Sequence, residues 1–291
     1  MTARINIPVD IRRRIGFIQG RLSPMVDGKI QAFPWDTWRD EFPIAARCGF
    51  TLMEWTLDHA RLHENPLMTD CGRKAIRHLM AEHAMGIPAV TGDCFMQAPF
   101  HKAAGQLRTR RIEALRAVVT AAGELGAGIL VLPLVDNGSL ENATQFSNLI
   151  AGLSDTAPLL RLAGVRIAME TDLSPIDTAA LIHALPPDAF GITYDMGNSA
   201  ALGYDPAEEW ATFGNRILHI HVKDRLLGGG TVPLGTGDAD LPGMMSQLVN
   251  AGYAGHLILQ TARAEDGRHD VSLAAFRDMV VDWWRQTGGV D

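Results

Sequence analysis

Residues 217–224 read Ile-Leu-His-Ile-His-Val-Lys-Asp, which places two histidines and a lysine at alternate positions. In a β-strand, His219, His221 and Lys223 would all project to one face. Three other apolar runs end in a side chain with an oxygen donor: Glu170, Asp195 and Gln260. If these segments are neighbouring parallel strands, their ends would bring carboxylates, an imidazole and an amide to one edge. That donor set suits one divalent metal ion, such as Mn, Co, Zn or Mg.

Short apolar strands alternate with amphipathic helices along the chain, and these elements must position the candidate ligands. In residues 106–125, for instance, Leu107, Ile112 and Leu115 recur at near-helical spacing. The expected strands are Ile15–Gln19, Phe50–Trp55, Ile87–Thr91, Ile129–Leu134, Val165–Glu170, Phe190–Asp195, Ile217–Val222 and His256–Gln260. Eight strand–helix units in 291 residues predict an α/β fold, a single (β/α)8 barrel over residues 1–291. An open doubly wound sheet is the alternative, but the turn after the first strand lacks a dinucleotide-binding glycine pattern.

Composition restricts the function classes. Hydrophobic residues make up 47% of the chain, which is enough for a large core, and the net charge is −7. An acidic chain without a basic stripe disfavours nucleic acid as a partner. No apolar run is long enough to span a membrane, residues 1–8 lack a signal core, and the three cysteines lack CxxC spacing. We therefore expect a cytoplasmic protein that acts on a small molecule. The chain could function as a monomer or as a homo-oligomer.

Each candidate ligand also has a structural interpretation. A carboxylate at the end of a strand often caps the helix that follows. Three consecutive strands that carry Glu170, Asp195 and His221 nevertheless favour a site, because barrel active sites lie at strand ends. His219 is better explained as a residue of the barrel interior beside His221 than as a ligand. Lys223 could lie near a carbonyl or phosphate oxygen, or could pair with a neighbouring aspartate.

Motifs spread over nearly the whole chain carry a family resemblance. They are Gln19-Gly-Arg-Leu-Ser-Pro24, Gly49-Phe-Thr-Leu-Met-Glu-Trp55, Met169-Glu170, Tyr194-Asp-Met-Gly-Asn198, His219-Ile-His-Val-Lys-Asp224 and Leu234-Gly-Thr-Gly-Asp238. In these motifs the sequence resembles the sugar phosphate isomerase/epimerase family, whose members have a xylose isomerase-like TIM barrel. The resemblance implies a divalent metal at the ends of the fifth to eighth strands. Its ligands here would be Glu170, Asp195 and His221, with Gln260 at the fourth position.

Two positions depart from the family pattern. The fourth ligand is usually a glutamate that also moves a proton, whereas Gln260 can coordinate a metal but cannot act as an acid or base. Many members carry a histidine where this chain has Asn198, an amide that can orient a hydroxyl. Glu170 is therefore the expected catalytic proton carrier. A second group for two-base chemistry would have to be Lys223, the other catalytic candidate, or Glu54.

Further side chains near the expected mouth of the barrel could contact a substrate. Arginines and glycine amides there could bind a phosphate or carboxylate, although bracing of loops would explain the arginines equally well. The expected substrate contacts are Arg21, Glu54, Asn198, His219, Arg225, Gly235, Gly237 and Arg263.

The favoured function is a metal-dependent isomerase or epimerase of a small sugar, sugar phosphate or keto-polyol. Glu170 would remove a carbon-bound proton, and the metal would stabilise the resulting enediolate. A dehydratase that eliminates water from a keto-polyol is the first alternative, because a single base suits elimination. A non-catalytic sugar-binding barrel that lost its second carboxylate is another. A DNA-repair endonuclease of the same fold is disfavoured by the acidic charge and by the lack of a histidine in Thr91-Gly-Asp93.

Overall fold

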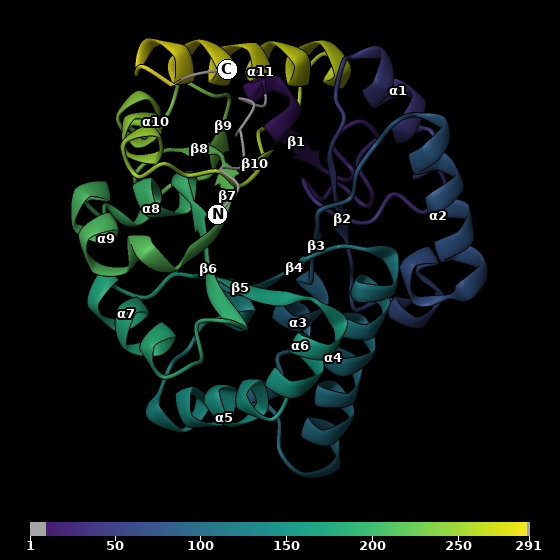
Figure 1. Ribbon diagram of the computed structural model, residues 1–291, viewed down its shortest axis with the longest axis vertical. Helices are drawn as coiled ribbons and strands as arrows, with labels where there is room; N and C mark the ends of the chain where they lie inside the picture. Colours follow the sequence, from purple (N-terminus) through teal and green to yellow (C-terminus); the bar gives the residue numbers. More distant parts are fainter. Residues whose placement is uncertain (1–9, 290–291) are drawn as a thin grey trace, which may run out of the picture.

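Eight strands pair in parallel and close into a barrel, and helices form a ring around it (Figure 1). The computed structural model describes residues 10–289, so the expectation of no signal segment in residues 1–8 falls outside the described residues. The barrel strands are β1 (Ile15–Ile18), β2 (Met53–Thr56), β3 (Ala89–Thr91), β4 (Ile129–Leu134), β5 (Arg166–Thr171), β6 (Phe190–Asp195), β7 (Ile217–Val222) and β10 (Leu257–Leu259). Each overlaps one predicted strand. The (β/α)8 TIM barrel is therefore confirmed, and the closed order β1-β10-β7-β6-β5-β4-β3-β2 excludes the open sheet.

The barrel is surrounded by helices (Figure 1), of which the longer ones present an apolar stripe to it. The helices are α1 (Glu41–Arg47), α2 (Asp70–Glu82), α3 (Asp93–Gln97), α4 (Gly105–Leu125), α5 (Ala143–Ser154), α6 (Ala157–Ala163), α7 (Pro175–His183), α8 (Met196–Leu202), α9 (Pro206–Phe213), α10 (Leu241–Asn250) and α11 (His269–Gln286). In α4, for example, Leu115, Val118 and Ala122 are buried. The helix ends at Gly126, whose φ of 95° is a left-handed conformation that favours glycine.

Buried apolar side chains of residues 10–289 form two separate clusters. The larger one packs the helices against the strands and includes Phe17, Leu115 and Val280. The smaller one consists of the strand residues Ala89, Ile129, Val131 and Ala168. Because side chains alternate between the two faces of a strand, the smaller cluster fills the inner face of the barrel.

The strand register explains why the candidate ligands meet. In the β6–β7 pair Asp195 lies beside His221, after a register shift at residues 192 and 193. In the β10–β7 pair Ile258 lies beside His221. The backbone N–H of Gln260 continues that ladder by donating to the carbonyl of Val222 at 3.0 Å. The carboxyl ends of β6, β7 and β10 are thus fixed at one level of the barrel.

A small hairpin after β7 was not predicted from the sequence. Its strands are β8 (Asp224–Arg225) and β9 (Thr231–Val232), which pair antiparallel. Two-residue strands are too short to show a periodic pattern, so the sequence did not distinguish them from the glycine-rich loop that contains them. The Asp224 carboxylate then orders the rest of the loop, because it accepts the backbone N–H groups of Gly235 at 2.8 Å, Gly237 at 2.9 Å and Ala239 at 3.2 Å.

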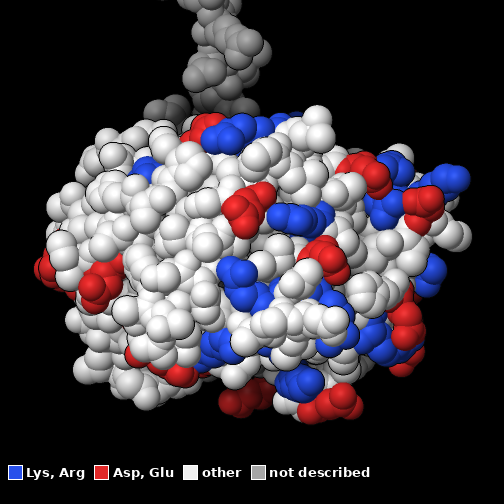
Figure 2. Space-filling view, turned by 90° about the horizontal axis from the view of Figure 1, so that it is seen from below, with Lys and Arg blue, Asp and Glu red and all other residues white. Residues whose placement is uncertain are grey.

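The surface carries interspersed charge. On the face drawn in Figure 2, basic and acidic side chains alternate rather than forming a stripe of one sign. None of the described helices is both long enough and apolar enough to cross a membrane.

Candidate metal centre and substrate cavity

Three of the four expected ligands converge at the carboxyl ends of β5, β6 and β7. The Nδ1 atom of His221 lies 3.6 Å from a Glu170 carboxylate oxygen and 3.8 Å from an Asp195 carboxylate oxygen. One ligand atom from each of the three residues lies within 4.8 Å of the other two. Glu170, Asp195, His221 and Gln260 are all buried. The strand-end pattern in the sequence therefore brings these side chains to one place.

Two buried side-chain atoms that carry lone pairs, one in this group and one on Gln260 in the wall of the adjoining cavity, have no hydrogen-bond partner among the described residues. They are Nδ1 of His221 and Oε1 of Gln260. Leaving a buried acceptor without a partner is costly, so such atoms call for a bound group that takes their lone pairs. Two carboxylates, an imidazole nitrogen and an amide oxygen together fit a divalent cation such as Mn, Co, Zn or Mg. The residues present thus fit the metal that the sequence led us to expect.

Asp195 also has the structural role considered for strand-end carboxylates. One of its oxygens accepts the backbone N–H of Asn198 at 2.8 Å and so caps α8. The other accepts from the Lys223 ammonium at 2.9 Å. Burial opposes ionisation, but the charges of Lys223 and His221 lower the pKa of Asp195. The carboxylate is therefore held in the charged form that a cation requires.

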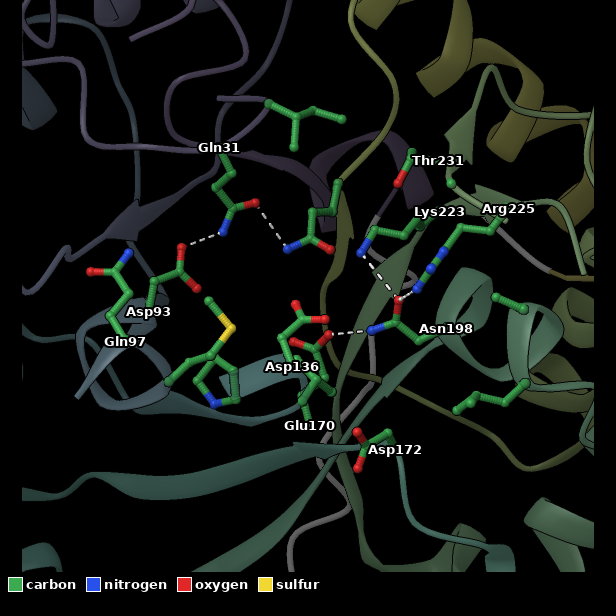
Figure 3. A pocket seen from close by; sticks show the side chains of 18 of the residues that line it. Gln31, Asp93, Gln97, Asp136, Glu170, Asp172, Asn198, Lys223, Arg225 and Thr231 are labelled. Carbon is green, nitrogen blue, oxygen red and sulfur yellow. Dashed lines mark hydrogen bonds between the residues drawn. The ribbon is translucent and has the colours of Figure 1, made fainter. Parts of the chain in front are cut away.

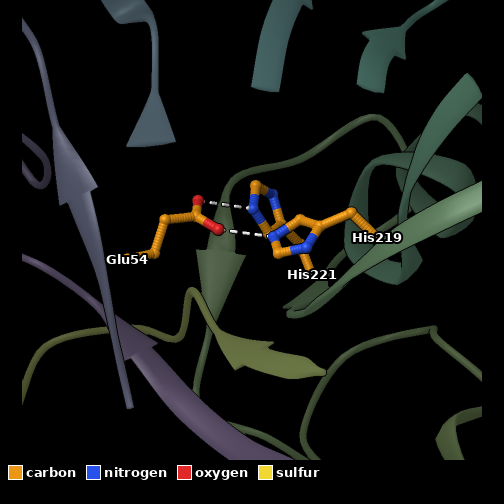
Figure 4. A group of neighbouring side chains, drawn as sticks. All are labelled: Glu54, His219 and His221. Atoms are coloured by element: carbon orange, nitrogen blue, oxygen red, sulfur yellow. Dashed lines mark hydrogen bonds and ion pairs between the residues drawn. The ribbon is translucent and has the colours of Figure 1, made fainter. Parts of the chain in front are cut away.

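A buried carboxylate beside His219 and His221 orients both imidazoles (Figure 4). Glu54 on β2 contacts Nε2 of His219 and, at 3.0 Å, Nε2 of His221. Burial opposes ionisation of Glu54, yet the two histidines hold its pKa well below the usual range. Glu54 thus accepts the Nε2 proton of His221 in a hydrogen bond and leaves the Nδ1 lone pair free. Carboxylate partners of this kind fix the tautomer of metal-binding histidines.

The same arrangement favours positive charge at His221. Burial alone would lower the pKa of this imidazole, but Glu54 and Glu170 raise it to about 10. A metal ion and a proton compete for the same Nδ1 position. The surrounding carboxylates therefore stabilise a cation at this point.

Glu54→Gln is expected to weaken metal affinity by about 10- to 100-fold, the usual effect of losing a carboxylate partner of a ligating histidine. An amide cannot supply the negative charge that holds both imidazoles. Calorimetric titration of the metal-free protein with Zn²⁺ measures the change. Glu209→Gln is the matched control, because Glu209 is also buried but accepts from Tyr194 and Ser199 and touches neither histidine. Equal affinities for the Glu54 variant and the wild type would contradict the role given to Glu54.

A cavity of about 570 Å³ opens above the ligands. Figure 3 shows Gln31 and Asp93 on one side of it and Lys223 and Arg225 on the other. Asn198 connects the basic side to the ligands, since its Nδ2 donates to Glu170 at 2.6 Å and its Oδ1 accepts from Arg225 at 2.8 Å. The cavity is thus large enough for a small polar molecule and is polar on both sides.

The structure separates the predicted site residues into two groups. Those that line the cavity are Glu170, Gln260, Lys223, Arg21, Asn198 and Arg225. Those that do not are Glu54, Asp195, His219, His221, Gly235, Gly237 and Arg263. Glu54 and His219 are buried beside His221, and the two glycine amides already donate to Asp224.

The two predicted arginines from the first and last strand ends act mainly as braces. Arg263 donates to the carbonyls of Gly20, Ser23 and Ile30. Arg21 reaches the cavity but donates to the carbonyls of Thr261 at 2.8 Å and Ile30 at 2.7 Å, and burial lowers its pKa to about 9. Arg225 and Lys223 also line the cavity, where Arg225 donates to Asn198 and to the carbonyl of Gly229 and Lys223 donates to Asp195.

Several residues of the cavity were not predicted, and Asp93 and Gln31 are the two that contact or approach the expected ligands. Asp93 begins α3 directly after β3, and its position after a strand end was a signal of the same kind as those at Glu170 and Asp195. Gln31 lies in the segment between β1 and α1, where no pattern marks it. Only the fold brings Gln31 against Asp93 and Gln260.

Comparison with known proteins identifies the family. Residues 42–279 match the model of the xylose isomerase-like TIM barrel family. The chain belongs to this family. Within the family, L-ribulose-5-phosphate 3-epimerase UlaE of Salmonella heidelberg (strain SL476) is 24% identical over 260 residues, which is 84% of this chain and 89% of the relative.

A second relative and a solved structure are also similar to this chain. Inosose dehydratase of Geobacillus kaustophilus (strain HTA426) is 22% identical over 163 residues, 48% of this chain and 53% of the relative. The structure of the IOLI protein with a zinc atom has a TM-score of 0.75 and 14% identity, covering 94% of this chain and 99% of that chain. That likeness shows that the two proteins share a fold.

Proposed function

We propose that this xylose isomerase-like barrel is a metal-dependent isomerase or epimerase of a small sugar or sugar derivative. The observation that carries the proposal is the unpartnered Nδ1 of His221, which faces Glu170 and Asp195 at the floor of a polar cavity. Glu170, Asp195 and His221 would hold the ion, with Gln260 as fourth ligand through its free Oε1. When bound, the ion would supply the positive charge that stabilises an enediolate.

The protein side chains would divide the remaining work. Glu170 would take the proton from the carbon next to the substrate carbonyl, and Asn198 would orient Glu170 through its 2.6 Å hydrogen bond. The Lys223 ammonium, which donates one hydrogen bond to Asp195, would donate another to a substrate oxygen. Arg225 beside it would contact a hydroxyl or an anionic substituent. The epimerase relative is named for a sugar phosphate, which supports including phosphorylated ketoses among the substrates to be tested.

Solvent deuterium incorporation tests the proposal. We expect the Zn²⁺- or Mn²⁺-loaded protein in D₂O to introduce deuterium next to the carbonyl of L-ribulose 5-phosphate or of an unphosphorylated ketose, measured by NMR of the purified sugar. Protein treated with a chelator serves as the control and should not do so. Metal and sugar binding without any exchange would contradict the proposal and favour a non-catalytic sugar-binding barrel.

A dehydratase of a keto-polyol is the second candidate. It is favoured by Gln260, which leaves Glu170 as the only glutamate among the expected ligands, and one base is enough for elimination. The partial match to inosose dehydratase agrees with this alternative. The same NMR spectra distinguish the two, because elimination yields a product that has lost water whereas isomerisation conserves the formula.

A further inference from the structure

Inversion at a carbon requires two proton-transfer groups, and among the expected ligands only Glu170 is available, because both oxygens of Asp195 already accept hydrogen bonds from Asn198 and Lys223. Neither substitute considered from the sequence is well placed. Glu54 is fully buried beside the histidines and does not line the cavity. The Lys223 ammonium is engaged with Asp195 at 2.9 Å. The cavity must therefore be searched for another group.

Asp93 is a buried carboxyl that lines the same cavity as Glu170. It is 7% exposed and enters from the turn after β3, whereas Glu170 enters from β5. One Asp93 oxygen accepts from Nε2 of Gln31 at 2.7 Å. The other oxygen has no hydrogen-bond partner in the part of the chain that the structure describes. It is therefore free to exchange a proton with a substrate.

A chain of two amides links Asp93 to the metal centre. Nε2 of Gln260 donates to Oε1 of Gln31 at 3.0 Å, and Gln31 in turn donates to Asp93. Gln260 can do this because an amide has N–H groups on one side and keeps its oxygen free on the other. A glutamate at this position would have no N–H to donate when ionised. The amide at position 260 thus orients Gln31 toward Asp93 as a donor.

We infer that Asp93 is the second proton-transfer group of the cavity, in place of the carboxylate that Gln260 lacks, and that Gln31 is its positioning residue. This inference rests on the proposed function. Glu170 takes the proton as the C–H bond breaks, and the electron pair passes into the enediolate. Protonated Asp93 then gives its proton to the opposite face of the same carbon, so its O–H bond breaks as the new C–H bond forms. In the reverse direction the two carboxyls exchange roles.

The surroundings of Asp93 suit a group that acts both as acid and as base. Burial raises the pKa of Asp93 to about 7, although the hydrogen bond from Gln31 opposes the rise. The charged and titratable groups that face it are Asp58, Glu170, His221, Arg21 and Cys94. Asp58 and Glu170 add to the rise, whereas His221 lowers the pKa. Near neutral pH both forms are present, which is the condition for efficient proton transfer in both directions.

The test compares proton exchange with epimer formation in Asp93→Asn. We expect the Zn²⁺-loaded variant, given L-ribulose 5-phosphate or L-ribulose in D₂O, to form epimer about 100-fold more slowly than the wild type. Deuterium should still enter the starting sugar whose proton faces Glu170, because Glu170 can remove and return that proton alone. A residue with a merely structural role would not separate exchange from epimerisation.

Glu209→Gln is the matched control, because Glu209 is also a buried carboxyl whose pKa is raised by burial, but it accepts from Tyr194 and Ser199 and does not line the cavity. Epimer formation in Asp93→Asn at the rate of this control would overturn the inference and leave the proposed function intact. An equal loss of epimer formation, exchange and Zn²⁺ affinity would also overturn it, since it would indicate a structural role. If the wild type showed neither exchange nor epimer, the proposed function itself would fail.

A direct measurement of the Asp93 pKa adds a readout that does not depend on turnover. In protein labelled with ¹³C at the aspartate carboxyls, the resonance lost in Asp93→Asn should titrate near pH 7. In Gln31→Leu the titration should move to higher pH, because the lost hydrogen bond favoured the charged form. Titration near pH 4 in the wild type, or no movement in the Gln31 variant, would contradict the roles given to these residues.

Discussion

Glu170→Gln is expected to lower kcat/KM by about 10,000-fold, the upper end of the range for loss of a general acid–base group. The effect is large because one side chain serves both as metal ligand and as proton carrier. Glutamine keeps the size of the side chain and can still accept the hydrogen bond from Asn198. It cannot take a proton from carbon. Steady-state kinetics with the sugar that gives deuterium exchange measure the loss.

Asp172→Asn is the control for this variant. Asp172 lies two residues further along the chain, lines the same cavity and accepts a hydrogen bond from Ser139. Its loss removes one negative charge from the cavity without touching the ligands, so activity should change little. A Glu170 variant that retained more than a tenth of wild-type activity would show that the proton carrier lies elsewhere.

Removal of the metal is expected to lower activity by about 1,000-fold or more, since a bound cation contributes several kcal/mol of transition-state stabilisation. Dialysis against a chelator should produce the loss, and Mn²⁺ or Zn²⁺ should restore activity. His221→Asn should resemble the stripped enzyme but should not recover when metal is added, because its Nδ1 donor is gone.

His101→Asn provides the comparison, because His101 is likewise buried but lies in the turn after α3, outside the metal centre. That variant should lose activity with chelator and regain it with metal. Full activity of the metal-free wild type would contradict a role for the ion in the reaction.

The barrel could be predicted because each strand has its own apolar run. The expected bounds agree with the observed ones where the strand is long. The expected strands Ile129–Leu134 and Phe190–Asp195, for example, have the same bounds as β4 and β6. The agreement is looser where few residues pair, as at β3, where only Ala89–Thr91 of the expected Ile87–Thr91 is a strand. The β8–β9 hairpin left no signal, because two paired residues show no alternation.

The convergence of the proposed ligands could be predicted for a different reason. In a parallel barrel the position of a residue at a strand end fixes its position in space, so Glu170, Asp195 and His221 could be placed together from their order alone. Contacts between distant segments could not be predicted in this way. The bond from Gln31 to Asp93 depends on how a loop folds over the mouth. The backbone N–H groups of Gly235 and Gly237 were expected to bind an anion. They donate instead to the nearby carboxylate of Asp224.

The most direct test is a crystal structure of the protein soaked with Mn²⁺ or Zn²⁺, with the ion located by anomalous scattering. We predict one ion within roughly 2.0–2.4 Å of a Glu170 oxygen, an Asp195 oxygen and Nδ1 of His221. Oε1 of Gln260 should be the fourth protein ligand, and Nε2 of His221 should remain on Glu54. An ion more than about 4 Å from these side chains, or bound through Nε2 of His221, would contradict the account.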